Sequence, residues 1–172
     1  MNEGGVIMSF RSWLFGKPSE YFGRSIDDPI PVNSPIGQVA YLSRLLTETG
    51  EKVFFHRFGS INTVDVYELV SESGALWDVL YLDMYHKKQS NRAPYGYILQ
   101  PSVGYIRGDH MYIEDFPASL YDVLRKSGGF PGHPVDPDCM KITGFKRPSW
   151  HVELLKGIQL HGRGYCMAVD KE

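Results

Sequence analysis

Three apolar runs, rich in aromatic and β-branched residues, follow one another between residues 52 and 100 and limit what this chain can fold into. Residues 53–58 and 64–70 are typical of strands, and the short polar segment between them is typical of a loop. The third run, residues 76–85, has the length and composition of either a strand or a helix, and its aromatic and β-branched residues favour a strand. The block therefore predicts a three-stranded antiparallel meander.

A helix over residues 35–48 is the clearest local prediction before this block. Ser34 can cap the first turn, Pro35 suits the first helical position, and Gly50 stands where a left-handed residue is favoured after a helix. Apolar residues recur at helical spacing from residue 36 to residue 46. This apolar stripe needs a surface to cover, which we expect to be the sheet.

The second half of the chain predicts shorter elements. They are a strand over 95–100, a hairpin formed by 103–107 and 110–113 around Gly108 and Asp109, a helix over 117–126, and strands over 152–155, 157–160 and 165–169. Pro117 suits the first turn of the helix, and Gly128 and Gly129 favour its termination.

Together these elements predict a single α+β domain over residues 35–172. We expect a mainly antiparallel, twisted sheet of about five to seven strands with two helices packed on one face. Residues 1–34 are interrupted by glycine and proline and predict an irregular N-terminal arm. Apolar residues occur on both faces of the run 76–85, so the second face also needs a cover, either the arm or another subunit. We therefore predict a homodimer.

Composition limits the location and partners only broadly. Cys139 and Cys166 are too few for a disulfide framework, which favours a reducing, cytoplasmic compartment. The N-terminal apolar patch is interrupted by polar residues and is too short for a membrane span. A net charge of -2 argues against nucleic acid as a partner. We expect no cofactor and no metal, because the loop 133–139 holds isolated ligand-type residues without paired cysteines or histidines.

The candidate site lies at the end of the third run. On a strand, Trp77, Tyr81, Asp83 and Tyr85 share one face and could line an aromatic pocket, while His86 points away. A carboxylate set among aromatic rings can have a raised pKa and act as a general acid or base. On a helix, Asp83 and His86 would converge instead.

The sequence names no reaction, so several functional hypotheses stay open. We favour a non-catalytic module that binds a small molecule or a protein partner, because 13% of the residues are aromatic and no G-x-S-x-G, H-E-x-x-H or P-loop motif occurs. The alternative is a small, hydrolase-like acid-base enzyme that uses Asp83 with His56 or His86. A weaker alternative is nucleotide or RNA binding, for which the contact residues would be Lys87, Lys88 and Arg92.

Overall fold

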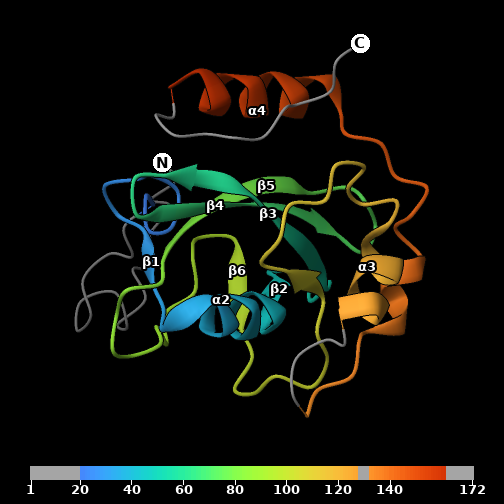
Figure 1. Cartoon of the computed structure of the whole chain (residues 1–172), viewed down its shortest axis with the longest axis horizontal. Helices are drawn as coiled ribbons and strands as arrows, with labels where there is room; N and C mark the ends of the chain where they lie inside the picture. The colour runs from blue at the N-terminus through green and yellow to red at the C-terminus, as the bar shows by residue number, and fades with distance from the viewer. Residues whose placement is uncertain (1–19, 128–131, 162–172) are drawn as a thin grey trace, which may run out of the picture.

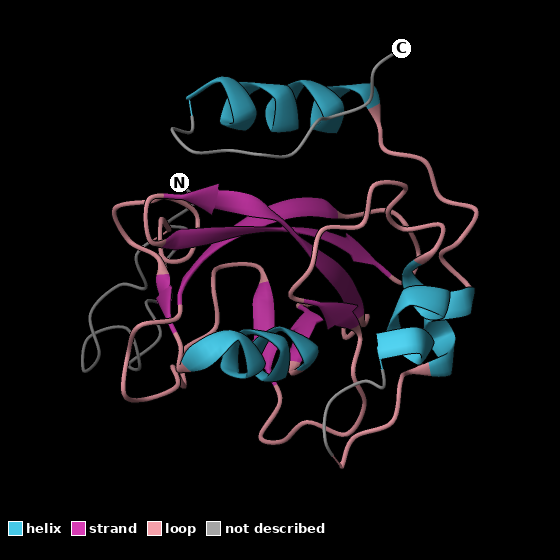
Figure 2. Ribbon diagram, in the orientation of Figure 1, coloured by secondary structure: helices cyan, strands magenta, loops and turns pink. Residues whose placement is uncertain are grey.

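The computed structural model describes residues 20–127 and 132–161, which fold into layers around a five-stranded sheet (Figure 1). The elements are β1 (Ile30–Pro31), α2 (Ser34–Ser43), β2 (Leu45–Thr47), β3 (Val53–Ile61), β4 (Val64–Ser71), β5 (Trp77–Asp83), β6 (Tyr97–Leu99), β7 (Gly108–Asp109), α3 (Leu120–Ser127), the 3-10 helix η1 (Pro137–Met140) and α4 (Ser149–His161). Figure 2 shows α4 on one side of the main sheet and α2 and α3 on the other. Within the described residues, no helix combines the length and the apolar character that crossing a membrane requires.

The main sheet has the strand order β1-β5-β4-β3-β7. Its centre is the predicted antiparallel meander, in which β4 pairs with β3 on one side and with β5 on the other. The strand prediction for residues 76–85 is therefore confirmed. The α+β class is confirmed as well, but the sheet is mixed, because both edge strands, β1 and β7, run parallel to their neighbours.

The predicted hairpin around Gly108 and Asp109 is wrong. These residues form β7, which lies parallel to β3 with Gly108 opposite Phe55. A Cβ atom on Gly108 would stand 2.2 Å from the carbonyl oxygen of Phe55. The glycine is therefore needed for a close approach between two backbones and not for a turn.

The first predicted helix is shorter than expected. α2 ends at Ser43, and the next residues form β2, which pairs antiparallel with β6. Leu45 lies opposite Leu99 in this two-stranded sheet, so tertiary pairing overrides the helical tendency of the segment. Gly50 does have positive φ, but it lies in the turn after β2. Asn33, and not Ser34, occupies the N-cap position.

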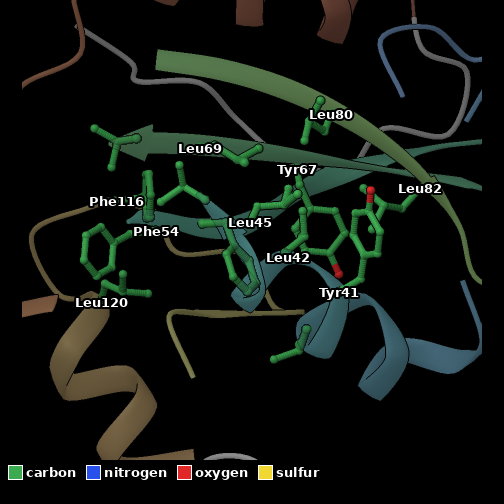
Figure 3. Packing of buried hydrophobic residues seen from close by; sticks show 14 of the residues in the cluster. Tyr41, Leu42, Leu45, Phe54, Tyr67, Leu69, Leu80, Leu82, Phe116 and Leu120 are labelled. Atoms are coloured by element: carbon green, nitrogen blue, oxygen red, sulfur yellow. The ribbon is translucent and has the colours of Figure 1, made fainter. Parts of the chain in front are cut away.

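The main core lies between the sheet and the layer formed by α2, β2 and α3. Figure 3 shows Tyr41, Leu42, Leu45, Phe54, Tyr67, Leu69, Leu80, Leu82, Phe116 and Leu120, all of which are buried. Leu80 and Leu82 come from one face of β5, as strand alternation predicts. This core fixes the position of β5 and leaves its other face to a second layer.

That second face is covered by α4. The predicted strands over 152–155 and 157–160 are wrong, because these residues form one helix. Leu155 is fully buried against Phe58, Val66 and Val79 of the meander, and Ile158, one helical turn later, packs beside it. Three helices are thus described instead of the two predicted, and they lie on both faces of the sheet. The strand predicted at 165–169 lies outside the described residues.

Candidate functional site

The predicted aromatic face of β5 points toward α4. Trp77 is buried, with its ring centroid 5.4 Å from that of His151, and Tyr81 packs half-buried beside the cluster that contains Leu155. Tyr85 follows the end of β5 and is 69% exposed. The structure therefore brings Trp77 and Tyr81 to the α4 interface but leaves Tyr85 on the surface.

Asp83 and His86 approach each other, against the expectation from strand alternation. β5 ends at Asp83, so the alternation of side chains stops there and the chain turns back. His86 Nε2 lies 3.0 Å from Asp83 Oδ2, and Asp83 Oδ1 accepts the backbone N–H of Tyr85 at 3.0 Å. Both carboxylate oxygens of Asp83 are thus engaged in a partly exposed turn.

The three predicted phosphate-contact residues lie in a surface loop that is fastened to the start of α2. Asn33 Nδ2 donates to the carbonyl oxygen of Lys87 at 3.1 Å. The side chains of Lys87 and Lys88 are exposed and have no ion-pair partner among the described residues. Arg92 instead holds its guanidinium 4.2 Å from the ring centroid of Phe22, a cation–π contact.

His56, the other histidine considered for catalysis, belongs to a buried polar cluster that sequence reasoning missed. We call this cluster the Glu68 clasp; it consists of His56, Glu68, Arg147 and His151. His56 Nε2 lies 2.7 Å from Glu68 Oε2, and His151 Nε2 lies 3.1 Å from Glu68 Oε1. Arg147 donates to both oxygens, from Nε at 2.7 Å and from Nη2 at 2.9 Å.

The hydrogen bonds of the clasp indicate which ring nitrogen of His56 carries the proton and that Glu68 is ionised. His56 Nδ1 accepts the backbone N–H of Ile113 at 3.0 Å, so a neutral imidazole must carry its proton on Nε2 and donate it to Glu68. Burial favours this state and lowers the pKa of His56. Burial alone would raise the pKa of Glu68, but the hydrogen bonds from His151, His56 and Arg147 outweigh it and hold that pKa far below its usual range.

The clasp is closed to a substrate in this arrangement. The side chains of Glu68, His56 and His151 are fully buried, and both oxygens of Glu68 are already bonded. A hollow of about 310 Å³ reaches Arg147 and Phe116, but the other three clasp residues do not line it. The arrangement is suited to fastening the segment that leads into α4, and its visible sequence signal is a glutamate at the centre of a fully buried strand, between Tyr67 and Leu69.

A groove of about 600 Å³ lies farther along α4. Leu154, Gly157 and Ile158 of the helix contribute to its lining, as do Ile61 of β3 and Tyr81 of β5. Residues 24–26 and Glu153 complete the lining, which is mostly apolar. Of the residues predicted from sequence to line a pocket, Tyr81 alone belongs to this groove.

The charge of Arg24 is already neutralised. Its Nη1 donates to both carboxylate oxygens of Asp78, at 2.5 and 2.6 Å, and its Nη2 donates to the carbonyl oxygen of Tyr95 at 2.8 Å. Burial lowers the pKa of Arg24, but the charge of Asp78 and the hydrogen bonds outweigh this effect and the pKa is raised. Arg24 therefore borders the groove as one half of an ion pair and not as an open anion site.

The hydroxyl group of Tyr81 is a polar group of the groove lining that the protein leaves unused. It makes no hydrogen bond to any of the described side chains or backbone groups. Burial raises the pKa of Tyr81, so the phenol stays protonated at neutral pH and can both donate and accept a hydrogen bond.

The loop 133–139 does not gather a metal site. Asp136 is buried and pairs with Lys52 Nζ at 3.0 Å and with Arg107 Nε at 3.4 Å. Burial raises the pKa of the Cys139 thiol to about 12, which keeps it protonated and unreactive. Among the residues that the structure describes, no three histidine, cysteine or acidic side chains gather in a way that could hold a metal ion.

Comparison of the chain with protein-family models, with curated proteins and with solved structures finds no match.

Proposed function

We propose that this protein is a non-catalytic binding module that takes a small, uncharged, mainly apolar ligand in the groove between α4 and the sheet. The observation that supports it is a largely apolar groove in which the Tyr81 hydroxyl is unengaged while the neighbouring Arg24 is neutralised. Apolar walls with a few placed polar groups are typical of small-molecule sites.

The size of the groove fits a ligand of this class. Small-molecule sites in proteins usually have volumes of about 300–1,000 Å³, and this groove has about 600 Å³. Burial of apolar ligand surface would supply most of the affinity, at about 25 cal/mol per Å² before the entropic cost of association. The Tyr81 hydroxyl would orient the ligand through one hydrogen bond.

The charges around the groove argue against an anionic ligand. Arg24 is paired with Asp78, which lies outside the lining, and the acidic residue of the lining, Glu153, pairs with Lys156 at 3.3 Å. A phosphate or carboxylate would meet no unpaired cation in the described lining. An uncharged ligand avoids the cost of leaving a desolvated charge without a partner.

The proposal is tested with two fluorescent probes that differ in charge. N-phenyl-1-naphthylamine is uncharged and has one N–H group that Tyr81 can accept, whereas 1-anilinonaphthalene-8-sulfonate is an anion. We expect saturable binding of the uncharged probe and no tighter binding of the sulfonate. Tyr81→Phe should weaken the uncharged probe about 5–10-fold, the usual effect of one lost hydrogen bond.

The matched control is Tyr105→Phe, which removes the same hydroxyl from an exposed tyrosine outside the groove lining. This variant should bind the probe like the unaltered protein. Non-saturable binding, or an equal effect of the two substitutions, would contradict the proposal.

The contact between Asp83 and His86 favours a second candidate, the small acid-base enzyme. Their 3.0 Å separation is within the reach that a general acid-base pair requires. If this candidate were correct, Asp83→Asn and His86→Gln would each abolish turnover of an activated ester such as p-nitrophenyl acetate. A turnover equal to the uncatalysed rate in the unaltered protein would remove it.

Two finer predictions accompany the proposal. A cytoplasmic location is supported by Cys139, a buried free thiol. A homodimer is the second, and sedimentation of the purified chain at micromolar concentration tests it.

A further inference from the structure

Gly157 occupies a position where the helix has no local reason for a glycine. It lies inside α4, four residues before the last helical residue, and glycine is a poor residue for a helix interior. A Cβ atom at this position would have no atom of the described residues within 4 Å. An alanine would therefore fit without a clash and would favour the helix.

Gly108 and Gly157 differ in what surrounds the position that a Cβ atom would take. At Gly108 the place of a side chain is taken by the backbone and ring of Phe55, so the fold itself requires the glycine. At Gly157 the corresponding place is open space, filled by no described residue, and Gly157 itself belongs to the groove lining. Gly157 thus contributes only backbone atoms to the groove lining, so this part of the lining carries no side chain.

This part of the lining belongs to the same groove as the ring of Tyr81. Leu154 and Ile158 flank Gly157 on α4, while Tyr81 and Ile61 belong to the sheet. A bare stretch of helix backbone and an aromatic ring both favour contact with flat apolar surfaces, and aromatic rings gain additional energy from stacked or edge-on contacts.

From this geometry we propose that Gly157 makes room for a flat, uncharged aromatic ring of the ligand, which lies against the α4 backbone while its polar group bonds to the Tyr81 hydroxyl. This inference rests on the proposed function and narrows it to planar aromatic ligands with one hydrogen-bonding group. Gly157 is then the residue that determines specificity for flat ligands.

The first test replaces the glycine in the full chain and follows N-phenyl-1-naphthylamine by fluorescence. Gly157→Ala should weaken the probe at least fivefold, and Gly157→Leu, which is larger and equally compatible with a helix, should abolish binding. Both variants should also raise the melting temperature, by about 2–4 °C for alanine, since the helix gains a better residue. A merely structural glycine would give the opposite change in melting temperature.

The matched control is Gly104→Ala, because a Cβ atom on Gly104 would also meet nothing within 4 Å among the described residues, yet Gly104 lies outside the groove lining. It should leave probe binding unchanged. The shape of the ligand is tested by displacement of the probe with 1-naphthol and with adamantan-1-ol. The flat alcohol should compete at least tenfold better than the globular one, and equal competition would overturn the planar class.

The outcomes separate the two proposals. If the unaltered protein fails to bind the probe, the proposed function fails. If it binds the probe and the two Gly157 variants bind equally well, only the role of Gly157 is overturned. A dimer that Gly157→Leu converts to a monomer in sedimentation would assign the space to a second copy of the chain and would also overturn it. If the double variant Tyr165→Ser/Met167→Ser binds the probe more tightly, the space beside Gly157 would be assigned to the chain's own C-terminal segment. That result would also overturn the role of Gly157.

Discussion

The two ends of α4 are attached to the sheet in opposite ways. Near its first turn, the Glu68 clasp uses buried charged and polar groups, in which both carboxylate oxygens of Glu68 are bonded and His151 Nδ1 alone lacks a partner among the described residues. Toward its last turns, the helix faces the sheet across a groove with apolar walls, a glycine with empty space beside it and an unengaged tyrosine hydroxyl. The clasp side chains are buried away from any other molecule, whereas the groove is open to one.

This difference shows that chemically versatile residues do not by themselves mark a functional site. His56, Glu68 and His151 include the residue types most often used in catalysis, yet all three side chains are buried, and both oxygens of Glu68 and both ring nitrogens of His56 are hydrogen-bonded within the protein. The groove is lined mostly by apolar residues without catalytic chemistry, and it can take a ligand because their side chains leave a space open. The clasp fixes the start of α4 so that the later turns stand over the sheet in a defined position.

The largest effect is expected from removing the charge at the centre of the clasp. Glu68→Gln preserves the shape but removes the negative charge that pairs with Arg147 and accepts from both histidines, and its amide N–H groups would face hydrogen-bond donors. Breaking a buried ion pair by altering one partner costs about 3–5 kcal/mol. Urea denaturation measures the loss.

The control is Glu153→Gln on α4, whose carboxylate is exposed and pairs with Lys156. Exposed pairs contribute about 0–1 kcal/mol. Equal losses in the two variants would contradict a structural role for the clasp.

A second prediction compares two neighbouring leucines of α4. Leu155 is fully buried against the meander, whereas Leu154 is 44% exposed at the groove. Leu155→Ala should lower the free energy of unfolding by about 2–4 kcal/mol because it leaves a cavity. Leu154→Ala should cost less than about 1 kcal/mol. A reversed order in urea denaturation would show that α4 presents its other side to the sheet.

The clasp also predicts how stability depends on pH. The pKa of His56 is lowered in the folded protein, so below about pH 6.5 the unfolded chain binds a proton at this residue that the folded chain does not. Stability therefore falls as the pH falls from 7.5 to 5.5, and His56 contributes to this loss. Urea denaturation at both values measures it. If His56→Gln retains the full pH dependence, another group causes it.

The residue pattern within short segments predicts the central meander but not the elements whose form depends on distant parts of the chain. The meander of β3, β4 and β5 follows from runs dominated by β-branched and aromatic residues, and its strands are confirmed. The hairpin at Gly108 and the strands within 149–161 are wrong for a common reason. A glycine needed for a close approach looks like a turn residue, and a short helix with few charges looks like short strands.

Of the residues that line the groove, Tyr81 could be predicted from the sequence and the others could not. Tyr81 follows from alternation along β5, because that face must meet whatever covers the sheet. Ile61, Gly157 and residues 24–26 come from distant parts of the chain, so their meeting depends on packing that no local pattern encodes. The partners of Glu68 show the same limit, since Arg147 and His151 lie about eighty positions away along the chain.

The smallest predicted effect concerns the charge preference of the groove. Asp78 neutralises Arg24, and Asp78→Asn keeps the shape of the side chain while releasing the guanidinium charge at the groove lining. The variant should bind 1-anilinonaphthalene-8-sulfonate about 3–10-fold more tightly, since a partly exposed cation attracts a sulfonate by about 1 kcal/mol. Binding of N-phenyl-1-naphthylamine should not change. An unaltered sulfonate affinity would mean that Arg24 does not face the bound probe, and the groove would then discriminate by shape and by Tyr81 without any help from charge.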